Sequence, residues 1–160
     1  MYTLTDEPAP QHLQATVEDI PEILEQRKRI YQDMGQTEPE PLSKMVATTR
    51  PFLEQAIPAG TFCGWLAIME NRIVAGGAVL LCPWPSHTYD GECRRATILN
   101  VYTYPEFRRR GIARQLMRTM IDWCRNQGLA MVYLHASNDG RALYESLGFE
   151  PTTEMRLKLK

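Results

Sequence analysis

The sequence predicts one domain of the mixed α/β (α+β) class over residues 1–160, with a central mixed β-sheet and helices beside it. First, 160 residues with a hydrophobic content of 44% are ample for a single core. Second, residues 61–70 and 72–81 are apolar runs around Asn71, which predicts an antiparallel hairpin. Third, residues 96–136 alternate strand, helix and strand, which predicts a parallel crossover. The sheet is therefore expected to have an antiparallel N-terminal half.

Local patterns predict the elements that precede the hairpin. These are a loosely held start, a short strand, a helix, a loop and a second helix, at residues 1–11, 12–17, 18–34, 36–41 and 42–57. Acidic residues and Pro21 favour the start of the first helix, because they suit its positive end and its unpaired N–H groups. Gly35 is expected to end this helix, and Pro51 predicts a break or restart within the second.

The second half of the chain alternates strands and helices. After the hairpin, the sequence predicts a long loop, the central strand, a long helix, another strand, a short helix and a last strand, at residues 83–94, 96–104, 111–127, 130–136, 139–147 and 149–159. Gly76 and Gly77 fall inside a predicted strand, which indicates a bulge or a close approach of another backbone. About four helices are therefore expected to flank the sheet.

Composition excludes several classes of function. A net charge of −1 offers no field for nucleic acid or for an anionic membrane. The four cysteines lack Cys-x-x-Cys spacing and matching histidine pairs, so neither a metal site nor a disulfide framework is expected. Reduced thiols favour the cytoplasm. The sequence has no N-terminal apolar segment for export and no apolar run of about 18 residues that would span a membrane. We expect a cytoplasmic protein whose partners include neither nucleic acid nor membrane.

The most informative segment is the basic turn Tyr-Pro-Glu-Phe-Arg-Arg-Arg-Gly-Ile-Ala at residues 104–113, between the central strand and the long helix. N–H groups at a helix start have no partner within the helix and carry partial positive charge. Gly111 lacks the Cβ that would hold an anion away from the backbone, and arginines add forked donors suited to phosphate oxygens. The turn therefore predicts a phosphate site, and we call residues 108–113 the cradle. Neither a Walker loop nor a dinucleotide fingerprint matches, because their glycine spacings are missing.

Two motifs resemble the GNAT superfamily of acyl-coenzyme-A-dependent N-acetyltransferases. The cradle, Arg-Arg-Arg-Gly-Ile-Ala, matches the family's pyrophosphate motif Gln/Arg-x-x-Gly-x-Gly/Ala. Residues 134–138 and 142–150 resemble its later motif, a strand, an asparagine, a short helix with a tyrosine, and Leu-Gly-Phe. The resemblance covers residues 95–155, which it identifies as an acyl-CoA-binding core. It implies a GNAT-like fold, in which the sheet is split between the fourth and fifth strands.

The resemblance also implies a reaction, the transfer of an acetyl group from acetyl-CoA to a primary amine of a small molecule or peptide by direct attack in a ternary complex. Tyr144 matches the general acid that protonates the leaving thiolate. The residues implied to contact coenzyme A lie on the central strand, the cradle, the helix start and the later motif: Val101, Tyr102, Thr103, Arg108, Arg109, Arg110, Gly111, Ile112, Ala113, Arg114, Asn138 and Tyr144. Which arginines point inward is open, and an N-cap of the short helix is an equal alternative for Asn138.

No motif identifies the general base. Some relatives carry a glutamate on the central strand, where this chain has Asn100. His87 is the candidate with a suitable pKa, and Asp90, Glu92, Glu106 or ordered water are alternatives. An acidic and aromatic rim would attract a cationic amine. The candidate acceptor-binding residues lie on the first helix and in the long loop: Tyr31, Trp84, Tyr89 and Glu92.

Three alternatives stay open at this point. A domain of the same fold can bind acyl-CoA without catalysis, as a sensor or regulatory module. The arginine run can bind nucleic acid, with an affinity that falls steeply with salt, although the near-zero net charge disfavours this. A homodimer joined through the last strand is compatible with the enzyme.

Overall fold

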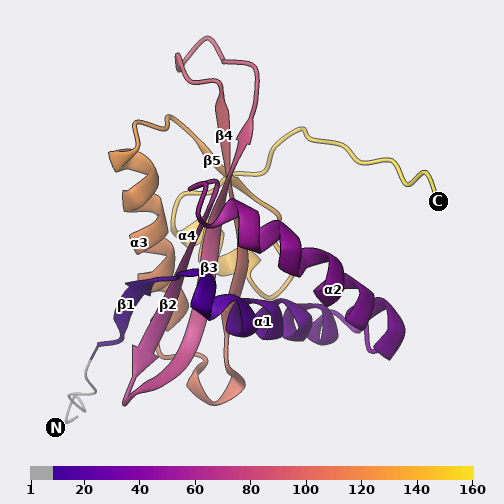
Figure 1. Cartoon of the computed structure of the whole chain (residues 1–160). Coiled ribbons are helices and arrows are strands. Elements are labelled where there is room, and N and C mark those ends of the chain that lie inside the picture. The colour runs from indigo at the N-terminus through magenta and orange to yellow at the C-terminus, as the bar shows by residue number, and fades with distance from the viewer. Residues whose placement is uncertain (1–8) are drawn as a thin grey trace, which may run out of the picture.

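Five strands form one sheet in the order β1-β2-β3-β4-β5 (Figure 1). The structure is a computed structural model that describes residues 9–160. The strands β1 to β4 pair antiparallel, and β4 pairs parallel with β5. Two clusters of buried side chains lie on the two faces, one beneath α1 and α2 and the other beneath α3 and α4. The predicted mixed sheet with an antiparallel N-terminal half and four flanking helices is confirmed.

The hairpin lies where the sequence predicts it. β1 (Gln11–Gln14) pairs with β2 (Phe62–Met69), and β2 pairs with β3 (Arg72–Pro83). Between β2 and β3, Glu70 and Asn71 have φ angles of 49° and 58°. Two left-handed residues are what a type I′ turn requires, and this turn matches the twist of the strands that it joins. Of the predicted loose start at 1–11, residues 1–8 lie outside the described residues, and Gln11 already belongs to β1.

The first two helices differ in how well the sequence predicts them. α1 (Ile20–Asp33) follows a 3₁₀ turn, η1 (Val17–Asp19), and Gly35 ends it with a φ of 87°. α2 (Pro39–Ala56) begins earlier than the predicted residue 42, and Pro51 lies inside it without a break. Leu53 and Ala56 are buried against α1 and the sheet. Their burial outweighs the lost backbone hydrogen bond at Pro51, so the predicted break is wrong.

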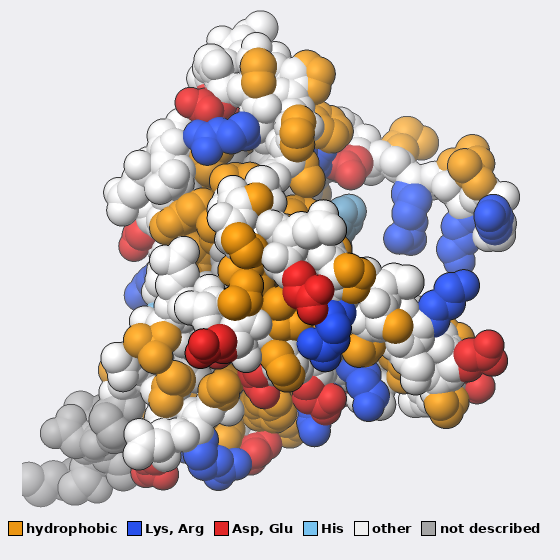
Figure 2. Space-filling view, viewed as in Figure 1, with side chains coloured by type: hydrophobic (Ala, Val, Ile, Leu, Met, Phe, Trp, Pro, Cys, Tyr) orange, Lys and Arg blue, Asp and Glu red, His pale blue; other side chains and the backbone are white. Residues whose placement is uncertain are grey.

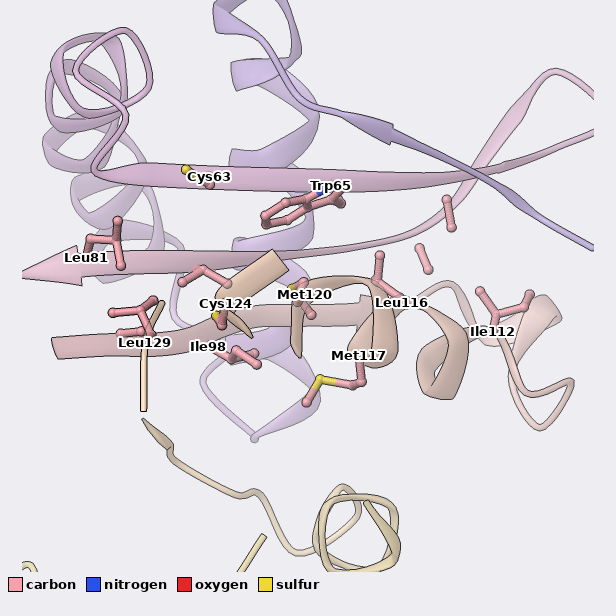
Figure 3. Close-up of a cluster of buried hydrophobic side chains, with 14 of the residues drawn as sticks. Cys63, Trp65, Leu81, Ile98, Ile112, Leu116, Met117, Met120, Cys124 and Leu129 are labelled. Atoms are coloured by element: carbon pink, nitrogen blue, oxygen red, sulfur yellow. The ribbon is translucent and has the colours of Figure 1, made fainter. Parts of the chain in front are cut away.

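The packing of α3 (Ile112–Asn126) fixes the other face of the sheet. Leu116, Met117 and Met120 have no exposed surface, and Figure 3 shows them beside Trp65 of β2 and Ile98. A Cβ at Gly77 would lie 2.9 Å from Met120 Cε, and one at Gly76 would overlap Gln26 Oε1 of α1. The close contacts at the two glycines are therefore with side chains, one on each face of the sheet, and not with another backbone. The predicted bulge is confirmed, because the pairing of β3 with the next strand shifts between Gly76 and Ala78.

The central strand β4 (Arg94–Thr103) pairs with its parallel neighbour over only the first part of its length. β5 (Val132–Leu134) pairs with β4 in three positions, the last being Leu134 opposite Ile98. β4 also carries a bulge, because the pairing with β3 shifts between Gly76 and Ala78 and Asn100 is left-handed with a φ of 57°. The residues of β4 beyond Ile98 have no β5 partner, which is the split that the resemblance implied.

The predicted last strand at 149–159 is wrong. After α4 (Arg141–Ser146), residues 149–160 contain no helix or strand. Met155, Leu157 and Leu159 are 94%, 81% and 87% exposed. Their alternation is a strand pattern, but a strand requires a neighbour to pair with, and within residues 9–160 none lies beside it.

Two negative findings apply to the described residues alone. No helix among residues 9–160 is long and apolar enough to cross a membrane. In the same residues, no three side chains of His, Cys, Asp or Glu are grouped so that they could hold a metal ion.

The glycine at position 76 gives a stability prediction. The variant Gly76→Ala must displace Gln26, a buried residue whose Nε2 donates to Glu22 Oε1 at 2.9 Å. We expect a loss of about 1–3 kcal/mol in the free energy of unfolding, measured by urea denaturation. The control Gly91→Ala adds its methyl to open space and should change stability by less than about 0.5 kcal/mol. Equal stability of the two variants would contradict this packing.

Candidate functional site

The cradle presents backbone N–H groups without partners. The chain leaves β4, makes a 3₁₀ turn at η2 (Pro105–Phe107), and enters α3 through left-handed Arg109 (φ 64°) and Gly111 (φ 77°). Gly111 is the N-cap, and no side chain caps the helix. Within the described residues, the N–H groups of Gly111, Ile112 and Ala113 donate to no other group. A Cβ at Gly111 would have nothing within 4 Å, so the space beside these amides is open.

The arginines of the cradle point in different directions. Arg108 links α1 to β4, because its Nη2 donates to Asp33 Oδ2 of α1 at 2.6 Å and its Nε donates to Thr103 O of β4 at 2.9 Å. The guanidinium of Arg110 lies 5.5 Å from the Phe107 ring centroid. Arg109 is exposed beside the free amides. Of the three consecutive arginines, Arg108 is therefore fixed to α1, whereas Arg109 lies exposed in the turn that leads to the open amides.

A hydrogen bond ties α4 to the start of α3. Arg114 Nη2 donates to Ser146 Oγ at 2.8 Å, so the short helix that carries Tyr144 lies against the first turn after the cradle. This contact occupies Arg114, a predicted coenzyme A ligand, and at the same time brings Tyr144 to the cradle side of the sheet. Val101 of β4 and Tyr144 pack against the same core cluster. The structure therefore groups the cradle, the open part of β4 and Tyr144.

Tyr144 is held by close packing. Its ring lies 6.1 Å from the Phe149 ring centroid, and burial raises the pKa of its hydroxyl above the ordinary 10.0. A Cβ at Gly140 would lie 2.8 Å from Tyr144 Cε2, so the absent side chain at position 140 makes room for the ring. Gly140 is the N-cap of α4 and no side chain caps this helix, although Ser137 Oγ accepts from the Gly140 N–H at 3.2 Å. Asn138 is exposed and does not serve as the cap.

Contacts from α1 surround the β4 bulge. Arg27 Nη1 donates to Asn100 Oδ1 at 2.8 Å, and the Arg27 guanidinium lies 5.3 Å from the Tyr31 ring centroid. Tyr31, a predicted acceptor residue, therefore lies near the bulge. Sequence reasoning missed Arg27, because nothing in a polar helical residue signals a contact with a strand far along the chain. Of the remaining predicted contacts on β4, Tyr102 is buried and Thr103 is half-buried.

The long loop lies at the other end of β4. This loop follows β3 and leads into Arg94, the first residue of β4, whereas the cradle follows its last residue (Figure 1). The residues from Arg94 to Val101 span about 20 Å of extended strand. His87 stacks on Tyr89 with ring centroids 4.7 Å apart. One shallow hollow there gathers the predicted residues Trp84, His87, Tyr89 and Glu92. The structure does not bring His87 or this group to Tyr144, because they flank opposite ends of one strand.

Comparisons with known proteins agree with this geometry. The sequence model of the Acetyltransferase (GNAT) family matches residues 21–149. The structure is similar to a GCN5-related N-acetyltransferase from Ralstonia eutropha JMP134, with a TM-score of 0.88 and 27% identity, over 94% of this chain and 98% of that one. It is also similar to a protein from Clostridium acetobutylicum described as a predicted acetyltransferase and solved with acetyl-CoA. That match has a TM-score of 0.83 and 25% identity, over 94% and 96% of the two chains.

Curated relatives match a shorter part of the chain. The [ribosomal protein bS18]-alanine N-acetyltransferase of Salmonella typhimurium is 42% identical over 64 residues, which are 38% of this chain and 43% of that enzyme. The chain spans 39% to 43% of the length of such relatives. The family match, by contrast, runs from α1 to Phe149 and includes the cradle, the split and Tyr144. The chain belongs to the GNAT family of acetyltransferases.

Proposed function

We propose that this protein is a cytoplasmic N-acetyltransferase that moves an acetyl group from acetyl-CoA to a primary amine of a small molecule or peptide, by direct attack in a ternary complex. The observation that carries the proposal is the set of open N–H groups at Gly111, Ile112 and Ala113. The name of the Salmonella relative supports a peptide amine as acceptor, because that enzyme acts on an alanine of a ribosomal protein.

The cradle suits the pyrophosphate of coenzyme A. Amides at a helix N-terminus donate to phosphate oxygens, and the helix dipole favours the negative charge there. Arg109 and Gly111 are left-handed, and left-handed residues are common in anion-binding turns. Arg109 is the side chain that we assign to the phosphates, because it is exposed in the turn. Arg108 is assigned instead to the link between the cradle and α1, because it already bonds to Asp33.

The open part of β4 suits the thioester arm. The residues after Ile98 have no β5 neighbour, so their backbone groups can pair with the amides of the pantetheine arm. In the reaction, the amine nitrogen bonds to the thioester carbon and the carbon–sulfur bond breaks. The carbonyl oxygen gains charge on the way, and a backbone N–H near Val101 or Tyr102 would stabilise that charge by roughly 2.7–4 kcal/mol.

We assign Tyr144 to the leaving thiolate. The departing sulfur carries the electrons of the broken bond and needs a hydrogen-bond donor. Because burial raises the pKa of Tyr144, its hydroxyl stays protonated at neutral pH and donates without giving up the proton fully. The proton that the amine releases goes to a base that is not His87, which lies in the loop at the far end of β4.

Acetyl-CoA binding tests the proposal most simply. At a hundredfold excess over its dissociation constant, acetyl-CoA should add ~2.7 kcal/mol of stability, which raises the melting temperature by roughly 5–11 °C for a chain of this size. The release of free coenzyme A is then measured with a panel of amines and amino-terminal peptides. Release with any of them shows that the protein is an enzyme. A stabilised protein that consumes no acetyl-CoA with any amine would be the non-catalytic sensor instead.

A pair of glycine variants tests the cradle. Gly111 and Gly128 both have a left-handed conformation, both border α3, and at both a Cβ would meet nothing within 4 Å. Alanine should therefore cost each of them a similar amount of stability, about 1 kcal/mol. Only Gly111→Ala should weaken coenzyme A binding, by about tenfold or more in calorimetric titration. Equal affinities of the two variants would rule out the amides as the phosphate site.

The variant Tyr144→Phe tests the assignment of the acid. It should lower kcat by about 100-fold and leave the dissociation constant of coenzyme A within about twofold, because the hydroxyl acts only on the departing sulfur. In the wild type, turnover limited by this hydroxyl should persist as the pH rises to 10 and fall only above it, since its pKa is raised. Unchanged kcat in the phenylalanine variant would remove Tyr144 from the chemistry.

A further inference from the structure

Arg27 of α1 carries a charge that no carboxylate among residues 9–160 balances. It is half-buried, and two of its five N–H groups are used: Nη1 donates to Asn100 Oδ1 at 2.8 Å, and Nη2 donates to the Tyr31 hydroxyl at 3.4 Å. Both acceptors are neutral groups. The Nε atom is buried and donates to nothing in the described residues. Such a charge is costly unless something pairs with it, because the hydration that it loses is otherwise not replaced.

Most half-buried arginines of this chain do have such a partner. Among the described residues, three of them form an ion pair with a carboxylate: Arg29, Arg94 and Arg95. Arg27 and Arg114 do not, and Arg114 lies beside the cradle, where a phosphate is expected. Figure 2 shows acidic side chains beside basic ones over α1 and α2, so acidic residues are not lacking on the side of Arg27. Arg27 therefore marks a second place where a ligand would supply the negative charge.

The guanidinium of Arg27 lies on the side from which an acceptor would approach. Its partner Asn100 is the left-handed residue of the β4 bulge, and Val101, near which we place the thioester carbonyl, follows it directly. Val101 and Tyr144 pack into the core cluster on the α3 face of the sheet, so the thiolate would leave toward that face. Arg27 reaches Asn100 from α1, on the opposite face (Figure 1). An amine that approaches the thioester from this face passes Arg27.

Coenzyme A itself does not supply the anion that Arg27 lacks. Its pyrophosphate is assigned to the cradle, which the chain reaches only after the end of β4 at Thr103 and the turn η2. The pantetheine arm that would lie along the open part of β4 carries amides and a thioester but no charged group. The negative charge that fits Arg27 would therefore belong to the acceptor.

We propose that the acceptor carries a carboxylate close to its reacting amine, and that Arg27 binds this carboxylate. The inference rests on the proposed function and narrows its acceptor to an amino acid or to a peptide with an acidic amino-terminal residue. A guanidinium presents parallel N–H groups that match the two oxygens of a carboxylate. The Tyr31 ring, whose centroid lies 5.3 Å from the guanidinium, and Asn100 hold Arg27 in place. A carboxylate bound there would orient the amine toward the thioester.

Matched acceptor pairs test this inference in the wild type. Coenzyme A release gives kcat/KM for α-amino acids against their α-amides, and for peptides that begin with aspartate against peptides that begin with asparagine. The carboxylate member should be preferred by about tenfold or more in one kind of pair, which then identifies the source of the carboxylate. Equal values within both kinds of pair, or a preference for the amides, would overturn the inference and leave acetyl transfer established. No turnover with any amine would reject the proposed function and this inference with it.

Two arginines of α1 give matched variants. Arg27→Gln should lower the ratio of kcat/KM for the carboxylate acceptor over its amide by about tenfold or more. The ratio is the readout because a distorted bulge would slow both acceptors alike. The control Arg29→Gln removes a half-buried guanidinium that is already paired with Glu25 Oε1 at 2.8 Å and should leave the ratio within about twofold. An equal loss with both acceptors, or the same ratio in the two variants, would overturn the assignment of Arg27 to the carboxylate.

Discussion

The packing of α3 against the sheet is the constraint on which the rest of this structure depends. Leu116, Met117 and Met120 are completely buried, and Gly77 leaves the space that Met120 needs. Because this face cannot move without opening the core, the first turn of α3 is held at the end of β4. The left-handed Gly111 then exposes the helix amides there. An anion site made of backbone groups is thereby rigid before any ligand arrives, which is what binding without a large ordering cost requires.

The early separation of β4 and β5 places the open part of β4 and the helix α4 beside the rigid anion site. Three paired positions hold the two strands together, and the chain beyond Leu134 diverges to form α4. The hydrogen bond from Arg114 to Ser146 holds α4 against the start of α3. The missing side chain at Gly140 leaves room for the Tyr144 ring. On the other face, Arg27 holds the bulge at Asn100, and Arg108 joins Asp33 to the cradle. Helices from both halves of the chain therefore meet around the last part of one strand.

Local chemistry made some of these features predictable, and long-range packing made others unpredictable. The hairpin at Asn71 and the cradle glycine each follow from a requirement of a few adjacent residues. The unbroken α2 does not, because the burial of Leu53 outweighs the effect of Pro51. The position of His87 depends on topology, since the loop before a strand and the turn after it lie at opposite ends of that strand. The last strand failed because alternation alone does not provide a neighbour.

Nitrogen-15 NMR tests the central claim most directly, because it observes the cradle amides themselves. Coenzyme A is titrated into labelled protein, and pantetheine, which lacks the pyrophosphate, serves as the comparison. The amide protons of Gly111, Ile112 and Ala113 should shift strongly downfield with coenzyme A and hardly at all with pantetheine, because only the former supplies phosphate acceptors. Binding of coenzyme A that perturbs other residues and leaves these three amides unchanged would contradict the account.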